Sequence, residues 1–264
     1  MWLKSIILSS SLLASTTIYA ETIFVSLEKD NAIAVVDPIA GKLIKTVAIG
    51  QRPRGIELSP DEQTLYIATS DDDTVITVDA NSLQVTGKLP AGEDPETFAI
   101  NPAGTHMYVS NEDDNQVTVI DLKTAKSIAT VAVGVEPEGI AVSPDGRWIV
   151  SASETTNMLH WIDANTNQIV KNTLVDPRPR ALSFTADGQQ LWVTSEIDGT
   201  VMILDVESKE ITQRTGFQIG GVGAEKIQPV GVKIDSQRRW AYVALGPANR
   251  VAVINAQTYD VEKY

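Results

Sequence analysis

The stretch PEGIAVSPDG at residues 137–146 decides the fold, because its first residue recurs along the chain at a fixed interval. Pro53, Pro95, Pro137 and Pro179 are each 42 residues apart, and Pro229 follows after a further 50. Self-similarity with a period of about 20 to 50 residues is typical of proteins built from repeated structural units. The chain is therefore expected to be a repeat protein.

A series of acidic residues has the same period. The series consists of Asp37, Asp79, Asp121, Asp163 and Asp205, each 42 residues apart, with Asn255 a further 50 residues on. Both series gain eight residues between Asp205 and Pro229, where the stretch Gly216 to Gly223 is the expected insertion. The sequence leaves open whether this insertion is a loop on the rim of the fold or a contact site.

Within each unit, apolar residues alternate with the period of β-strands. The unit that begins at Pro53 has four such segments, at residues 55–58, 65–68, 75–79 and 85–89, with turn residues between them. Four short antiparallel strands in 42 residues are typical of one blade of a β-propeller. We therefore predict an all-β fold, a β-propeller of four-stranded antiparallel blades over residues 21–264, with strands A to D in each blade.

A small residue followed by a large apolar one recurs in the predicted A strands. Small side chains are expected where the innermost strands converge, and the large ones should fill the contacts between blades. These pairs are Gly55 and Ile56, Thr97 and Phe98, Gly139 and Ile140, Ala181 and Leu182, and Gly231 and Val232.

About six units are present, and they do not close a ring of complete blades. Residues 23–50 supply strands B, C and D without an A strand, and Val261 to Tyr264 barely begin a last D strand. We therefore expect the chain to be C-terminally incomplete, lacking about one blade. An open arc of six units is the alternative.

The first 20 residues are expected to form a secretory signal peptide. Lys4 precedes a short apolar stretch, and the small residue Ala20 stands at the expected cleavage site. The chain has no cysteine, which excludes Cys-based metal sites and covalent c-type haem, and its net charge is -13. This charge argues against nucleic acid as a partner, and the sequence after residue 20 has no apolar run long enough for membrane insertion. The expected location is the periplasm.

The repeat motifs resemble the YVTN-type β-propeller repeat. The matching segments are Pro137 to Gly146, Tyr108-Val109-Ser110-Asn111 and Val117 to Thr124. The segments around Pro53, Pro95, Pro137 and Pro179 look like one subfamily, the exported propeller associated with pyrroloquinoline-quinone (PQQ)-dependent alcohol catabolism. This resemblance implies a seven-bladed full-length protein and PQQ as a candidate ligand. It also implies a periplasmic quinoprotein dehydrogenase or a transporter component as partner.

The candidate binding residues lie at the predicted channel mouth. In an up-and-down blade, the D–A and B–C connections emerge on the same face, which collects the residues around each repeated proline. These residues are Arg52, Arg54, Asp94, Glu96, Glu136, Glu138, Arg178 and Arg180. Arginine matches carboxylates in bidentate pairs, so the ring is suited to a polycarboxylate such as PQQ or to a polar peptide. The favoured alternative is that these charges pair with one another between blades.

Other candidates for chemistry are weaker. The acidic turns at residues 71–73 and 112–115 have oxygen ligands for calcium but lack EF-hand spacing, so we interpret them as solvated hairpin tips and predict no metal site. His106 and His160 have no nucleophile motif near them, and no catalytic residue is predicted. The strand tryptophans and tyrosines are expected to pack between blades.

The sequence thus favours a non-enzymatic periplasmic propeller that binds a partner protein or a small acidic ligand, accessory to quinoprotein-dependent alcohol catabolism. One alternative is an enzyme or enzyme subunit, such as a lactonase-like or quinoprotein-dehydrogenase-like propeller. Another is a structural surface protein with YVTN repeats. Because propellers host many functions, the fold alone does not choose among them.

Overall fold

The computed structural model describes residues 22–264, which form six antiparallel sheets, numbered here as blades 1 to 6 in chain order. Blade 1 consists of β1 (Ile23–Leu27), β2 (Ala32–Asp37) and β3 (Lys42–Ala48). Blade 2 consists of β4 (Pro53–Leu58), β5 (Thr64–Thr69), β6 (Thr74–Asp79) and β7 (Val85–Pro90). Blade 3 consists of β8 (Pro95–Ile100), β9 (His106–Asn111), β10 (Gln116–Asp121) and β11 (Lys126–Ala132).

The remaining blades repeat this order. Blade 4 consists of β12 (Pro137–Val142), β13 (Trp148–Ser153), β14 (Met158–Asp163) and β15 (Gln168–Leu174). Blade 5 consists of β16 (Pro179–Phe184), β17 (Gln190–Ser195), β18 (Thr200–Asp205) and β19 (Glu210–Gly216). Blade 6 consists of β20 (Pro229–Ile234), β21 (Trp240–Leu245), β22 (Arg250–Asn255) and β23 (Val261–Lys263). Short 3₁₀ turns are η1 (Glu28–Asp30), η2 (Ser70–Asp72), η3 (Ala224–Lys226) and η4 (Gly246–Ala248).

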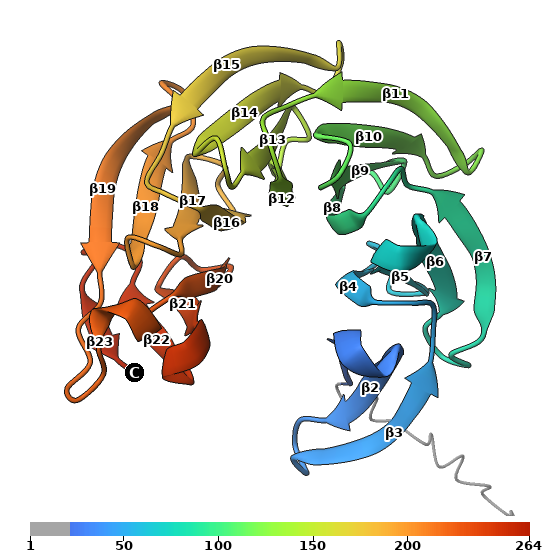
Figure 1. The fold of residues 1–264 in the computed structure, drawn as a ribbon, viewed down its shortest axis with the longest axis horizontal. Helices are drawn as coiled ribbons and strands as arrows, with labels where there is room; N and C mark the ends of the chain where they lie inside the picture. The colour runs from blue at the N-terminus through green and yellow to red at the C-terminus, as the bar shows by residue number, and fades with distance from the viewer. Residues whose placement is uncertain (1–21) are drawn as a thin grey trace, which may run out of the picture.

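The blades are arranged as an arc around an axis, as in a β-propeller (Figure 1). The A strands β4, β8, β12, β16 and β20 line the inside, and the D strands, such as β7 and β11, form the outer edge. Blade 1 has three strands and lacks an A strand, as predicted, and the arc is open between blade 1 and blade 6. The predicted all-β propeller of antiparallel blades is therefore confirmed.

The periodic aspartates shape the C–D turns. The carboxylate of Asp79 accepts hydrogen bonds from the backbone N–H of Ser82 and Asn81, and that of Asp121 accepts one from Thr124. These are Asx-turns, which satisfy backbone donors that the strands cannot. Gly146 and Gly188 have φ of 72° and 68°, as a tight A–B hairpin after an aspartate requires.

The cores lie between successive blades. Phe98 of blade 3 packs in one cluster with Ala68, Val75 and Leu89 of blade 2. The small residues of the A strands allow this close approach, because a Cβ added to Gly139 would lie 1.8 Å from the backbone oxygen of Arg180 in the next blade. The predicted pairing of small and large residues at these strands therefore has the physical role expected of it.

The end faces of the arc show what a neighbouring blade normally covers. Val25 of blade 1 is 42% exposed, whereas Val109, at the equivalent position of blade 3, is fully buried. Tyr242 of blade 6 is 44% exposed, whereas the equivalent Tyr108 and Trp192 are buried. The prediction that all strand aromatics pack between blades is thus wrong for Tyr242, because no blade follows it in the arc.

The insertion lies in the D–A connection between blades 5 and 6. This connection spans residues 217–228, twelve residues where the other D–A connections have four, which accounts for the eight extra residues. Phe217 and Ile227 are buried in the core between these blades. The insertion is therefore anchored by its ends and lies on the same face as the other D–A connections.

Two further expectations concern the signal peptide and membrane insertion. The predicted signal peptide, residues 1–20, lies outside the described residues. Within residues 22–264, no helix combines the length and apolar character needed to cross a membrane.

Candidate functional site

The D–A connections place the candidate residues in a fixed backbone conformation. The residue before each repeated proline has a left-handed φ: 49° at Arg52, 44° at Asp94, 57° at Glu136 and 59° at Arg178. This conformation costs a non-glycine residue about 1 to 2 kcal/mol. Its occurrence in four successive blades indicates that surrounding contacts impose it.

Hydrogen bonds on both sides of these residues supply those contacts. The N–H of Arg52, Glu136 and Arg178 donates to the side-chain oxygen of an asparagine in the preceding blade, and Asp73 plays this role for Asp94. The carbonyl oxygen of each residue accepts a bond from the N–H at the end of strand B in its own blade: Ser70, Glu112, Glu154 and Glu196. Both the D–A and the B–C connections thus meet on one face, as predicted, and each is held rigidly against the other.

We call the eight predicted side chains, together with the acidic residues that lie close to them, the rim. Arg52 contacts Asp94 at 3.0 Å, Glu28 and Glu96 at 3.3 Å, and Asp71 at 3.8 Å. Desolvation lowers the pKa of Arg52, but the attraction of Asp94 and Glu96 outweighs it and leaves the pKa above its usual value. Arg52 is therefore charged and surrounded by carboxylates from three blades.

Arg54 and Arg180 extend the pairing along the arc. Arg54 contacts Glu28 at 3.3 Å and also pairs with the buried Glu96. Glu138 joins the two halves, because its Oε1 lies 3.3 Å from Arg54 Nη2 and 2.9 Å from Arg180 Nη2. Arg180 pairs further with Glu154 and, at 3.7 Å, with Glu196.

Arg178 and Glu136 complete the set of predicted residues. Arg178 contacts Glu154 at 3.0 Å and Glu196 at 3.1 Å. Glu136 accepts a hydrogen bond from the hydroxyl of Thr155. All eight predicted residues therefore lie on one face, and seven of them join a network of ion pairs that runs from blade 1 to blade 5. This is the pairing between blades that the sequence favoured.

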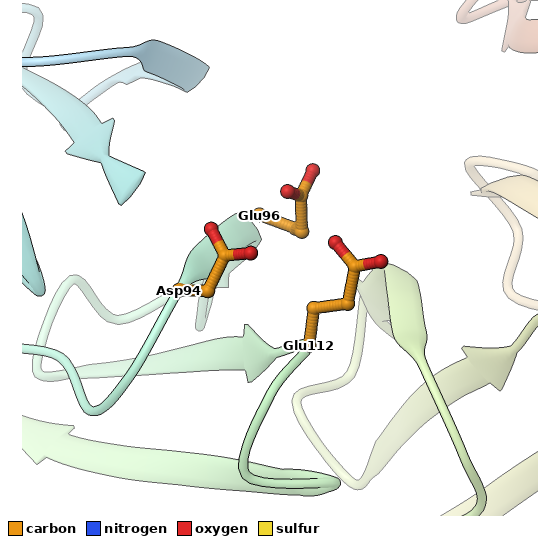
Figure 2. Close-up of side chains that lie close together, drawn as sticks. All are labelled: Asp94, Glu96 and Glu112. Carbon is orange, nitrogen blue, oxygen red and sulfur yellow. The ribbon is translucent and has the colours of Figure 1, made fainter. Parts of the chain in front are cut away.

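Three carboxyl groups of the rim lie unusually close together. One oxygen each of Asp94, Glu96 and Glu112 lie within 4.8 Å of one another, and Figure 2 shows the three side chains close together. Glu96 is fully buried, and the carboxyl of Glu112 hydrogen-bonds to it. Burial, and then the neighbouring charge of Glu138, raises the pKa of Glu96 to about 9, although Arg54 acts in the opposite direction. Two carboxyls that share a hydrogen bond need a proton between them, so Glu96 is protonated at neutral pH.

The rim contains more acidic side chains than arginines. Four arginines face nine acidic side chains, which are Glu28, Asp71, Asp94, Glu96, Glu112, Glu136, Glu138, Glu154 and Glu196. Each arginine already contacts at least two carboxylates. A tricarboxylate such as PQQ therefore does not fit this arrangement, because it would have to displace the protein's own carboxylates.

Three rim residues, Glu28, Glu154 and Glu196, were missed as candidates although they belong to a periodic series in the sequence. Glu28, Ser70, Glu112, Glu154 and Glu196 form a third series with a spacing of 42 residues, at the ends of the B strands. This series could have predicted that Glu154 and Glu196 lie beside Arg178 and Arg180. Their role was hidden because glutamate at a strand end is common on any solvated surface.

The histidines and tryptophans lie outside the rim network. His160 is buried; its Nε2 accepts a hydrogen bond from the N–H of Gly134, and its Nδ1 pairs with the side-chain oxygen of Asn172. Burial lowers its pKa, so the ring is neutral and serves to hold the D–A connection of blade 4. Trp148 is half-buried toward the opposite face, where it packs against the core between blades 4 and 5 and lies close to the cations of Arg147 and Lys209.

Comparison with known proteins agrees with this architecture. Residues 64–175 match the profile of the YNCE-like beta-propeller family. This match covers most of blade 2 and all of blades 3 and 4, whose four-stranded unit recurs in blades 5 and 6. A solved structure described as Kuenenia stuttgartiensis hydrazine synthase superimposes with a TM-score of 0.80 at 21% identity, over 89% of this chain and 73% of that one. At this identity the likeness shows the fold alone. No curated protein matches the chain.

Proposed function

We propose that this chain is an exported, non-enzymatic binding propeller whose D–A/B–C face seats a partner protein. The observation that carries the proposal is the fixed geometry of the rim. Four successive D–A connections hold charged side chains on left-handed backbone that is hydrogen-bonded on both sides. Preorganised polar groups at a concave mouth are suited to binding, because little conformational freedom is lost when a ligand arrives.

A partner protein is favoured over a small acidic ligand. The arginines that would bind a polycarboxylate already contact carboxylates of the rim, which has nine acidic side chains to four arginines. Excess carboxylates instead attract lysine or arginine of a partner. PQQ is therefore the less favoured of the two ligand classes expected from the sequence.

A non-enzymatic role is supported by how the ionisable groups are used. Most rim carboxyls contact arginines, Glu136 accepts a hydrogen bond from Thr155, and Glu112 shares one with Glu96. Both nitrogens of His160 are engaged in structural hydrogen bonds. A general base or nucleophile needs a free position directed at a substrate. The residues of the rim are arranged for recognition.

The partner that we propose is a periplasmic quinoprotein dehydrogenase or a component of its associated transporter. This part of the proposal depends on the resemblance of the repeat motifs to the exported propeller of PQQ-dependent alcohol catabolism. The accessory role would then be to hold or present the enzyme through the D–A/B–C face.

Biolayer interferometry with an immobilised quinoprotein alcohol dehydrogenase of the same organism tests the proposal. We expect saturable binding that weakens at least about ten-fold when Arg178→Glu and Glu136→Lys reverse two charges of the rim. The reason is that charges at an interface set its electrostatic complementarity to the partner. The control variant Glu207→Lys changes the charge on the opposite face and should bind like the wild type. Thermal unfolding confirms that each variant is folded.

Binding that is indifferent to the rim variants would overturn the proposed face. Calorimetric titration with PQQ, with and without calcium, distinguishes the acidic-ligand alternative. We expect no heat of binding. Micromolar affinity that disappears in the Arg54→Ala, Arg180→Ala double variant would instead make the protein a cofactor carrier.

A further inference from the structure

The exposed side chains around the rim divide the D–A/B–C face into two sectors of different chemistry. The acidic sector, on blades 2 and 3, consists of the exposed residues Asp71, Asp73, Glu93, Asp113 and Asp114. The apolar sector, on blades 4 and 5, consists of Val135, Leu174 and Ile197, which are 43%, 69% and 68% exposed. These residues lie in connections of the same face, except Leu174, which is the last residue of strand β15 and precedes such a connection.

Turn geometry does not explain this division. Asp71, Asp113 and Ile197 occupy the same position of the B–C turn in blades 2, 3 and 5. Glu93 and Val135 likewise occupy the same position of successive D–A connections. Because the backbone at each position accepts either side chain, the change from acid to apolar residue is not needed for folding.

The acidic sector is one continuous surface. The N–H of Asp94 donates to Asp73 Oδ1 at 3.1 Å, and the N–H of Glu93 donates to Asp114 Oδ2 at 3.2 Å. One D–A connection thereby joins the acidic turns of blades 2 and 3. Five exposed carboxylates so close together produce a strong negative field, which would be relieved by a cationic partner.

Hydrogen bonds also join the two segments of the apolar sector that contain Leu174 and Ile197. The N–H of Glu196, beside Ile197, donates to the carbonyl of Arg178, which ends the D–A connection that follows Leu174. Thr200 Oγ1 donates to Asp176 in the same connection. Arg178, a rim residue with a side chain 45% exposed, is the last residue of this connection, and arginine is enriched at binding surfaces.

We propose that this face binds a protein segment in which lysine or arginine residues stand beside apolar ones. The basic side chains bind the acidic sector, and the apolar side chains cover Val135, Leu174 and Ile197. This inference rests on the proposed function, because it assumes that the D–A/B–C face is the one a partner uses. It adds the chemistry of the partner, which the rim alone does not define.

Fluorescence anisotropy with three synthetic peptides of about 15 residues tests the inference. The first alternates lysine with leucine, the second lysine with serine, and the third glutamate with leucine. We expect the Lys–Leu peptide to bind most tightly, the Lys–Ser peptide about ten-fold more weakly, and the Glu–Leu peptide not at all. Raising the ionic strength from about 0.05 M to about 0.5 M should remove most Lys–Ser binding, because salt screens exposed charges.

Matched variants locate the binding on this face. Neutralising the acidic sector with Asp71→Asn, Glu93→Gln and Asp113→Asn should weaken Lys–Leu binding at least about ten-fold. Neutralising three exposed acids of the opposite face with Glu62→Gln, Glu207→Gln and Glu210→Gln removes the same charge and should have little effect. Leu174→Ser with Ile197→Ser should abolish the preference for Lys–Leu over Lys–Ser, whereas Ile39→Ser, at an isoleucine 81% exposed on the opposite face, should keep it.

The outcomes separate this inference from the proposed function. If both neutralised triple variants lose equal affinity, the attraction comes from the overall charge and the inference is wrong. If the peptides fail to bind while the dehydrogenase binds the rim, the inference is wrong and the proposed function stands. If neither the peptides nor the dehydrogenase bind this face, both are wrong.

Discussion

Replacing Glu96 by glutamine should stabilise the protein at neutral and alkaline pH, with almost no effect near pH 5. Glu96 is fully buried, and its pKa is raised from 4.5 to about 9. Between these two values the folded protein keeps the proton and the unfolded chain loses it. The contribution of Glu96 to stability is therefore complete below about pH 4.5 and falls as the pH rises toward 9. Glutamine resembles the protonated acid in shape and does not titrate.

The magnitude follows from the linkage between protonation and folding. One pKa unit corresponds to about 1.4 kcal/mol, so the wild type should lose up to about 3 kcal/mol relative to Glu96→Gln between about pH 6 and pH 8. Because Glu96 interacts with neighbouring carboxyls, we expect a change of about 2 kcal/mol in the difference between the two free energies of unfolding. Urea unfolding followed by tryptophan fluorescence at several pH values measures this difference.

The control is Asp113→Asn, which removes an exposed carboxylate of the same face. It should change the free energy of unfolding by less than about 0.5 kcal/mol, because the side chain is exposed. If the difference between wild type and Glu96→Gln stays constant from pH 5 to pH 9, Glu96 is ionised in the folded protein. The claim that the buried Glu96 of the rim is protonated at neutral pH would then be wrong.

Three further predictions concern the packing between blades. Gly139→Ala should destabilise the protein by about 2 to 4 kcal/mol, because the added Cβ would lie 1.8 Å from a backbone oxygen of the next blade. Gly231→Ala is at the same repeat position, but its nearest contact would be at 3.5 Å, so it should cost less than about 1 kcal/mol. Thermal unfolding measures both changes. Burial lowers the pKa of His160, so the unfolded chain takes up the proton first and stability should fall as the pH drops below about 6.5; His160→Met should flatten that part of the pH profile of unfolding. Trp161→Ala removes a fully buried ring between blades 4 and 5 and should cost about 3 to 5 kcal/mol in urea unfolding.

Much of the fold could be predicted because each blade repeats the same local signals. Pro137, Asp121 and Gly139 each belong to a series that fixes a strand start, a turn or a close approach between blades. The repeat period therefore predicted the strand order, the missing A strand of blade 1 and the position of the insertion. Pairing between neighbouring blades followed directly from this order.

The candidate site was predictable in position but not in chemistry. The eight residues lie at the channel mouth as expected, yet their partners Glu154 and Glu196 come from strand ends 42 residues apart whose significance depends on three-dimensional contact. The left-handed backbone of Arg52 and its equivalents also has no local signal, because it is imposed by hydrogen bonds from other segments. The excess of acids over arginines, which disfavours a polycarboxylate, became visible only when both sets were placed together.

Hydrogen exchange of the chain, alone and saturated with the quinoprotein dehydrogenase, tests the central claim most directly. The account predicts slower exchange in the B–C turns and D–A connections, such as residues 92–94, 112–115 and 196–199, where the rim amides lie. The C–D turns at residues 80–84 and 206–209, on the opposite face, should be unchanged. Protection confined to the C–D turns, or none at saturating dehydrogenase, would contradict the claim that the D–A/B–C face is the binding face.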